Sequence, residues 1–336
     1  MKSDEIGVTA IEGILVGHAQ DDEALTGCTV IICKNGATGG VDQRGGAPGT
    51  RETDLLHPMH MVEKVHAIML SGGSAFGLDA ASGAMQYLEE NKVGVNTGVA
   101  KVPIVPSAIL FDLAIGSSDI RPDKEMGYKA CINASSKAPK QGNYGVGTGA
   151  TVGKIFGMGQ SMKSGVGMAG INLGGGLLIS AIVAVNAFGD VIDPKSGKIV
   201  AGARSMKKGP LKLGSKFYFA DTLEIMKSFV GKTVLTFASK QNTVIGVVVT
   251  NANLTKEETN KVAQMAQNGL ALSIRPAHTM LDGDTIFVMA TGKRKADVNL
   301  VGAYAAEVVS HAILNAVKYS ESVNGLPGLK NLNKEK

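Results

Sequence analysis

Apolar positions along this chain are mostly spaced as in β-strands. Residues 5–42 alternate and turn like strands, and "KNGA" (34–37) is expected to form a hairpin turn between two of them. Unbroken apolar runs at 244–249 and in "TIFVMAT" (285–291) predict two further strands. Glycine recurs every few positions over 143–193, where each interior glycine would cost a helix about 1 kcal/mol. Short, closely packed strands and turns are therefore expected there.

Helical spacing is confined to a few long segments. The stretch 65–90 predicts a buried strand, a glycine turn and a helix with apolar residues at 76, 80 and 84. A capping box from Thr255 to Glu258 opens a second helix. A third is expected over 296–320, where apolar residues form one stripe. Because each helix must bury one face, we expect an α+β fold with helices outside stacked sheets.

Composition narrows the class of protein. The chain has 336 residues, 44% of them apolar but only 4% aromatic, with 44 glycines. This predicts a large core of small aliphatic side chains. The net charge of +5 comes largely from lysines in 203–216 and in the tail, without interleaved aromatics, which argues against nucleic-acid binding.

The expected location is the cytoplasm. Three cysteines without metal spacing indicate a reducing compartment. The first residues lack the pattern of a signal peptide, and no apolar run approaches the length of a membrane span, so no membrane partner is expected.

Two glycine-rich patterns in the chain resemble nucleotide-binding motifs, but each lacks residues that its motif requires. In "GVGTGATVGK" a phosphate-binding loop would need glycine at Thr148 and a hydroxyl residue at Ile155. The spacing Gly145, Gly147, Ala150 fits a dinucleotide motif, but no acidic residue follows at the required distance. No cofactor is expected.

Two other motifs also fall short of known chemistry. "SGGSAFG" resembles a nucleophile elbow around Ser74, but Phe76 stands where that turn needs glycine. "HTMLDGD" brings together His278, Asp282 and Asp284, too few ligands for a Ca²⁺ loop, and its Asp-Gly pair is equally typical of a turn. No metal site is expected. Thr243, at the start of the 244–249 run, is by spacing alone an ordinary strand residue.

Six ordered segments give a more specific indication. They are "TGCTVIICKNGATGGVDQRGGAPGTRET", "HAIMLSGGSAFGLDAASG", "GTGATVGK", "AIVAVNAFGDVID", "QNTVIGVVVTNANLTKEE" and "HTMLDGDTIF". Over roughly residues 5–320 the chain resembles the self-processing, S58-type peptidase family of L-aminopeptidase D-amidase/esterases, β-aminopeptidases and 6-aminohexanoate-oligomer (nylon oligomer) hydrolases. Thr243, Lys154 and the two aspartates resemble the nylon-oligomer branch most.

The resemblance implies a four-layer αββα sandwich of the N-terminal-nucleophile hydrolase type. A single domain spanning 1–336 would cut itself between Asn242 and Thr243 into subunits 1–242 and 243–336. The Thr243 hydroxyl would attack the Asn242 carbonyl, and water would resolve the ester. The new α-amine, with an ordinary pKa of about 7.7–8.0, could then deprotonate the same hydroxyl.

By resemblance the catalytic cluster comprises Thr243, Lys154, Asn186, Asp282 and Asp284. Lys154 could stabilise the deprotonated hydroxyl or hold down the α-amine pKa, and the Asn186 amide could donate to the oxyanion. Asp282 and Asp284 could orient the Thr243 ammonium and Lys154. Two alternatives stay open: Lys154 as a surface lysine and Asn186 as a turn residue.

The expected activity is hydrolysis of a linear amide, either an ω-aminoacyl oligomer or an N-terminal aminoacyl residue. The loop "RGGAPGTRETD", with Arg44, Arg51 and Glu52, could contact substrate or a second subunit. The mature form is expected to be a homo-oligomer, a tetramer of two-fragment protomers. The alternatives are an ornithine-acetyltransferase-type acyltransferase and an uncut binding protein of the same fold.

Overall fold

Six helices are present in the part of the chain that the computed structural model describes, residues 6–205, 218–228 and 242–332. They are α1 (Ala80–Glu90), α2 (Lys124–Ile132), α3 (Thr222–Lys227), α5 (Lys256–Ser273), α6 (Val298–Lys318) and α7 (Leu329–Leu332). Short 3₁₀ turns occupy Val8–Ala10, Asp54–Leu56, Ser74–Asp79, Gly145–Gly147 and Met158–Gln160.

A nine-stranded sheet organises the described residues, with strand order β10-β11-β14-β16-β2-β4-β7-β3 and β1 added on β2. Its strands are β1 (Ile14–Asp21), β2 (Thr26–Gln43), β3 (Thr50–Arg51), β4 (Lys64–Ser71), β7 (Ser107–Ile109), β10 (Val166–Asn172), β11 (Leu178–Asn186), β14 (Thr243–Asn253) and β16 (Thr285–Lys295). The smaller sheets use β5 (Val95–Asn96), β6 (Lys101–Val102), β8 (Thr151–Val152), β9 (Met162–Lys163), β12 (Asp190–Ile192), β13 (Ile199–Ala201) and β15 (Ile274–Arg275).

Strand β2 joins the two halves of the large sheet. Its first half pairs with β1, its second half with β16, and its register with β4 shifts between Ile32 and Ala37. The hairpin expected at "KNGA" is therefore wrong, because the chain continues through these residues as one strand. Lys34 and Asn35 are exposed at the irregularity, whereas the apolar residues on both sides of it are buried and keep the strand paired.

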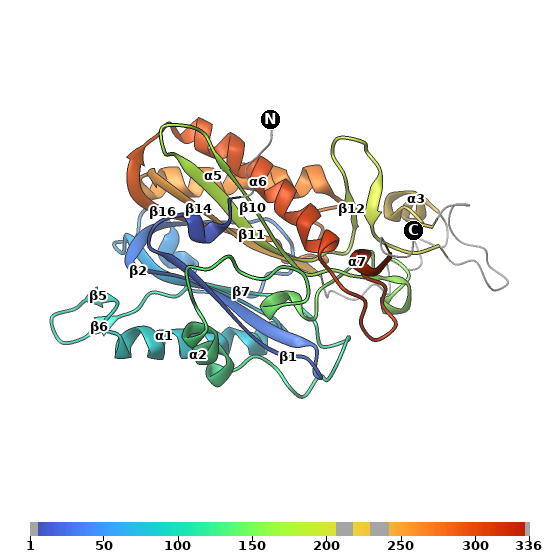
Figure 1. Cartoon of the computed structure of the whole chain (residues 1–336), viewed down its shortest axis with the longest axis horizontal. Coiled ribbons are helices and arrows are strands. Elements are labelled where there is room, and N and C mark those ends of the chain that lie inside the picture. The colour runs from blue at the N-terminus through green and yellow to red at the C-terminus, as the bar shows by residue number, and fades with distance from the viewer. Residues whose placement is uncertain (1–5, 206–217, 229–241, 333–336) are drawn as a thin grey trace.

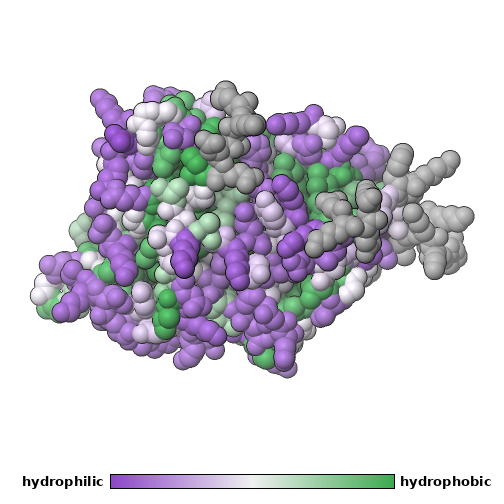
Figure 2. All heavy atoms as spheres, in the orientation of Figure 1, coloured by the Kyte–Doolittle hydropathy of each residue, from purple (hydrophilic) through white to green (hydrophobic). Residues whose placement is uncertain are grey.

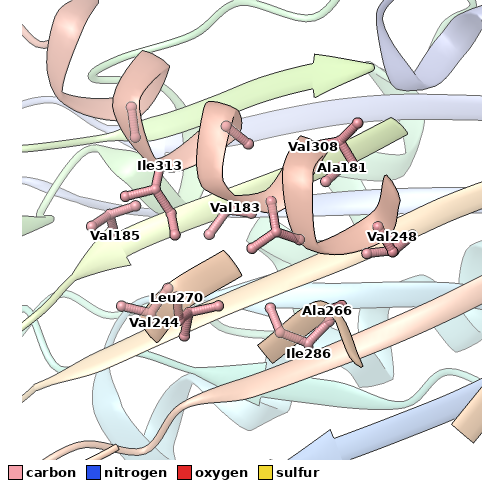
Figure 3. Packing of buried hydrophobic residues seen from close by; sticks show 14 of the residues in the cluster. Ala181, Val183, Val185, Val244, Val248, Ala266, Leu270, Ile286, Val308 and Ile313 are labelled. Carbon is pink, nitrogen blue, oxygen red and sulfur yellow. The ribbon is translucent and has the colours of Figure 1, made fainter. Parts of the chain in front are cut away.

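Three hydrophobic clusters separate four layers. In the first, side chains of α5 and α6 such as Leu270 and Ile313 pack on Val183 and Val244 of the sheet (Figure 3). The second lies between the two halves of the sheet and joins residues such as Ile31 to Val247. In the third, α1 and α2 cover the opposite face. Figure 1 shows these helix pairs on opposite sides of the strands. The αββα sandwich is thus confirmed.

Two of the three expected helices are present where the sequence placed them, and the third begins later than expected. Thr255 and Glu258 form the reciprocal capping box, and the helix expected over 296–320 is α6. By contrast, the segment after β4 begins as a 3₁₀ turn, so Phe76 does not lie on the buried face of a helix. Phe76 is 61% exposed, and the Arg121 guanidinium lies 4.0 Å from the centroid of its ring.

Helix α6 departs from the expectation that no segment could span a membrane. By length and apolar composition it could do so, with a mean hydropathy of 1.4. However, 61% of that window is buried, and α6 packs on α5 and on β10 and β11. These contacts are those of a core helix in a globular protein. Hydrophilic residues cover most of the face drawn in Figure 2, with smaller apolar patches between them.

The three cysteines Cys28, Cys33 and Cys131 are free and buried, consistent with structural thiols. Most of the lysine-rich stretch 203–216 and the last four residues of the tail lie outside the described residues.

Candidate active site

Thr243 is the first residue of β14, at the end of the sheet where three chain segments meet. It lies opposite Asn186, the last residue of the antiparallel strand β11. On the other side, Asn242 bridges to Asp282 just before β16, which runs parallel to β14. The sheet therefore gathers four of the expected residues into one place. Each is buried, with Thr243 4% exposed and Asn186 0%.

The peptide bond between Asn242 and Thr243 is held by two donors. The Thr243 hydroxyl donates to the carbonyl oxygen of Asn242. The backbone N–H of Gly283 donates to the same oxygen over 3.0 Å. A carbonyl with two fixed donors is polarised, and the Thr243 hydroxyl oxygen lies beside it.

Lys154 reaches the site from the loop after β8. Its Nζ donates to Oδ1 of Asn186 over 2.7 Å and to the Asn186 backbone oxygen over 2.9 Å. Burial of Nζ lowers the Lys154 pKa to about 7, although the charges of Asp282 and Asp112 act in the opposite direction. Close to neutral pH, Lys154 can thus exchange a proton.

A glycine allows Lys154 to take this position. Gly153 has a φ of +73°, and a Cβ there would lie 1.9 Å from the backbone nitrogen of Ala203. The backbone N–H groups of Gly153 and Lys154 donate to Gly189 and Phe188. The glycine next to Lys154, which resembles part of a nucleotide loop in sequence, serves close packing instead.

Asn186 lies between Lys154 and the rest of the sheet. Its Oδ1 also accepts from the backbone N–H of Thr151 over 3.1 Å, and its Nδ2 donates to the Phe111 carbonyl over 2.8 Å. The side chain is thereby fixed in one orientation. This arrangement differs from that of the turn residue considered as an alternative, because Asn186 ends a strand and is fully buried.

The two aspartates approach Thr243 differently. Asp284 accepts the backbone N–H of Val244 through Oδ1 over 2.8 Å. Asp282 accepts from the Phe188 N–H and from Thr279. Burial raises the Asp282 pKa, and the neighbouring charge of Asp284 adds to that effect. Asp284 thus contacts the residue after Thr243, whereas Asp282 is the carboxylate that acts electrostatically on Lys154.

The loop that contains Arg44 forms hydrogen bonds with the backbone of both aspartates. The Ala47 N–H donates to the Asp282 carbonyl over 2.8 Å, and the Arg44 N–H donates to the Asp284 carbonyl over 2.9 Å. At Gly45, a Cβ would lie 2.2 Å from the Asp282 oxygen. The glycines of this loop therefore let two backbones approach closely, a role that the sequence motif alone did not indicate.

Two further side chains belong to the site without having been expected there. Nδ1 of His278 lies 3.0 Å from Oδ2 of Asp284, and the His278 backbone N–H donates to the same oxygen. Asp112 is 4% exposed and accepts from Thr26 and from the Gly73 N–H. Burial raises the Asp112 pKa to about 6.

Asp112 and Lys154 line a small pocket together with Phe111, Thr151 and Met158. The pocket places a buried carboxyl and an amine beside the end of β11. In the described parts of the chain, no three His, Cys, Asp or Glu side chains are grouped as a metal ion would require.

The αββα sandwich, with a buried threonine, lysine, amide and two carboxylates at one end of its sheet, defines a fold of the N-terminal-nucleophile-hydrolase type. The L-aminopeptidase D-Ala-esterase/amidase from Ochrobactrum anthropi, described as a variant of that fold, superposes with a TM-score of 0.69 at 16% identity. The match covers 96% of this chain and 88% of that one.

The chain belongs to peptidase family S58, whose model matches residues 7–331. An uncharacterised aminopeptidase of Mycobacterium leprae is 41% identical, over 95% of this chain and 92% of its own length. A 6-aminohexanoate-oligomer endohydrolase of Kocuria sp. is 31% identical, over 91% and 84%. The family expected from the sequence is confirmed, and with it an enzyme that hydrolyses amide bonds.

Proposed function

We propose that this chain is a self-processing amide hydrolase whose nucleophile is Thr243. The observation that carries the proposal is the geometry of one peptide bond: the Thr243 hydroxyl and the Gly283 N–H both donate to the Asn242 carbonyl oxygen. Cleavage at this bond would leave the nucleophilic hydroxyl and a free α-amine on the same residue, Thr243.

Self-cleavage begins with attack of Thr243 Oγ1 on the carbonyl carbon of Asn242. Lys154, with a pKa of about 7, accepts the hydroxyl proton, and the Gly283 N–H stabilises the oxyanion. The C–N bond breaks, and the nitrogen of Thr243 takes up the proton as it leaves. Water then hydrolyses the Asn242 ester, which restores the hydroxyl and leaves a free carboxylate.

Turnover repeats the same chemistry on an external amide. The α-amine of Thr243 now serves as base, the hydroxyl attacks the substrate carbonyl, and the amine product leaves. Asp284 holds the backbone next to the nucleophile through the Val244 N–H. The oxyanion role of Asn186 would use the amide hydrogen that is not donated to Phe111. A second water releases the acyl group.

The substrate class follows from charge and from the relatives. The buried Asp112 carboxyl beside Lys154 is complementary in charge to an ammonium group, and the pocket that they line, of about 30 Å³, has room for such a group but not for an acyl chain. Substrates of an aminopeptidase and of a 6-aminohexanoate-oligomer hydrolase both present an amine. We infer that the substrate is a linear amide with an amino-terminated acyl group.

The tetramer of two-fragment protomers remains a prediction, which light scattering of the purified protein tests.

The test of this function is a set of amides that differ only in their amino group. L-Alanine and β-alanine 4-nitroanilides and linear 6-aminohexanoate oligomers are incubated with the purified protein, without any amine acceptor. We expect hydrolysis of at least one of them, loss of turnover on N-acetylation of the substrate, and none in a Thr243→Ala variant. Turnover only after an amine acceptor is added would instead indicate an acyltransferase, and turnover by Thr243→Ala would contradict the nucleophile.

A further inference from the structure

A second concave site lies far from Thr243. It has a volume of about 600 Å³, within the range of ~300–1,000 Å³ typical of small-molecule pockets. Its wall is formed by the irregular part of β2, the start of β4, and the segment from the end of α1 through β5 and β6. In Figure 1, β5 and β6 lie at the opposite end of the molecule from β12, which follows Asn186. The pocket is therefore separate from the active site.

Positive charge dominates this second pocket. Four exposed lysines line it, Lys34, Lys64, Lys92 and Lys101, against one carboxylate, that of Glu63. Within the described ranges, none of these lysines forms an ion pair with a carboxylate. Four like charges around a hollow with a single carboxylate beside them repel one another, and an anion in the hollow would relieve that repulsion.

His66 adds a fixed donor to the same wall. Its side chain is only 6% exposed, and Nδ1 accepts the backbone N–H of Ile104 over 3.2 Å. In a neutral ring this leaves the proton on Nε2. No described residue accepts a hydrogen bond from Nε2. Burial lowers the His66 pKa, and the charges of Lys64 and Lys101 lower it further, so the ring is a neutral N–H donor at neutral pH.

The remaining wall is apolar. Val62, Val93 and Val95 are partly or fully buried and line the pocket beside the lysines. A ligand that fills this volume therefore meets aliphatic side chains as well as cationic groups.

We propose that this pocket binds a small organic or inorganic polyanion, such as a phosphate ester or a polycarboxylate. Its anionic group would lie at Lys64, Lys101 and the Nε2 proton of His66. The Nε2 hydrogen of His66 has no acceptor among the described residues, and an anionic oxygen in the pocket would accept it in a charge-assisted hydrogen bond. Because the site is remote from Thr243, such a ligand would bind without occupying the substrate pocket.

The experiment uses the ¹⁵N-labelled full chain and follows the imidazole signal of His66, assigned with a His66→Gln variant. Pyrophosphate and citrate are titrated at constant pH and ionic strength, with chloride as the monovalent control. We expect a saturable change of the His66 signal with at least one polyanion. Tighter binding of pyrophosphate would indicate a phosphate-type ligand, and tighter binding of citrate a carboxylate-type ligand.

Charge variants separate a specific site from general attraction. The double variant Lys64→Ala, Lys101→Ala should weaken binding by about tenfold or more. A matched change at an exposed lysine elsewhere, Lys198→Ala, should leave it unchanged. Circular dichroism checks that each variant is folded. No saturable change up to about 10 mM of either polyanion, or equal weakening by Lys198→Ala, would overturn the proposal.

Discussion

Asn186 and Thr243 lie opposite each other where β11 and β14 meet at the end of the sheet. Neither residue has a local sequence signal for catalysis, yet the antiparallel register brings them together with 0% and 4% of their surfaces exposed. Lys154 binds Asn186 from the side, and Asp284 binds the N–H of the residue after Thr243. The sheet register therefore brings the residues of the candidate site together.

Truncation of Asn186 tests its proposed role at the oxyanion. An Asn186→Ala variant should lower kcat by about 10²–10³-fold and change KM little, as for the loss of one oxyanion donor. Kinetics on the best amide substrate measures this, and thermal unfolding checks the fold. Asn299→Ala, an exposed asparagine on α6, is the matched control. An unchanged kcat would remove Asn186 from the proposed machinery.

Self-cleavage should depend on the protonation of Lys154. Because burial lowers its pKa to about 7, the neutral amine that accepts the Thr243 proton becomes more abundant as pH rises through 7. Pulse-labelled precursor from cell-free synthesis should be cut faster at pH 8 than at pH 6. Lys154→Met should cut slowly and without that pH dependence, whereas the exposed Lys198→Met should behave like the parent. A Lys154→Met chain that is cut at the parent rate would contradict this role.

Because of the buried Asp112 carboxyl, the folded state should be more stable in mild acid than at neutral pH. Its pKa is about 6 in the folded chain, against 3.8 for an ordinary aspartate, so the folded state binds more protons between these values. Its contribution to the free energy of unfolding therefore grows as pH falls from 6 towards 4.

The check is a double difference in the uncut Thr243→Ala background. Urea unfolding with and without Asp112→Asn should show the gap between the two chains shifting by about 2 kcal/mol in favour of the aspartate from pH 7 to pH 4.5. A gap that does not change with pH would mean that Asp112 has an ordinary pKa.

Close packing under the aspartates gives a prediction for Gly45. A methyl group there would lie 2.2 Å from the Asp282 carbonyl oxygen, so Gly45→Ala should destabilise the uncut chain by about 1–3 kcal/mol and slow self-cleavage. Gly159→Ala is the control, since no atom lies within 4 Å of its Cβ position. It should stay within about 0.5 kcal/mol of the parent. Equal stability of the two variants, measured by urea unfolding, would refute the packing argument.

Local signals predicted local features well. The Thr255 capping box and the apolar stripe of α6 depend on neighbours three and four positions apart, and both are present. The turn at "KNGA" was mispredicted because its exposed polar residues suit a turn and a strand irregularity equally. Burial of the flanking residues by two facing layers, which is a tertiary effect, decided the outcome.

The residues of the candidate site could not be predicted from the spacing of residues in the sequence. Thr243, Lys154 and Asn186 were assigned through the family resemblance, because pairing between distant strands cannot be read from periodicity. Asp112 and His278 were missed for the same reason: each joins the site through contacts with segments remote in sequence or through an irregular turn. In hindsight the only signal was the proximity of His278 to the two aspartates in "HTMLDGD".

The most direct measurement is the intact mass of freshly purified protein under denaturing conditions, beside Thr243→Ala. Dividing the 34.7 kDa mass in proportion to residue number predicts fragments of about 25 kDa (1–242) and about 10 kDa (243–336) from the parent, with Thr243→Ala remaining whole. A parent chain that stays uncut would lack the free α-amine on which the proposed mechanism depends, and would contradict it.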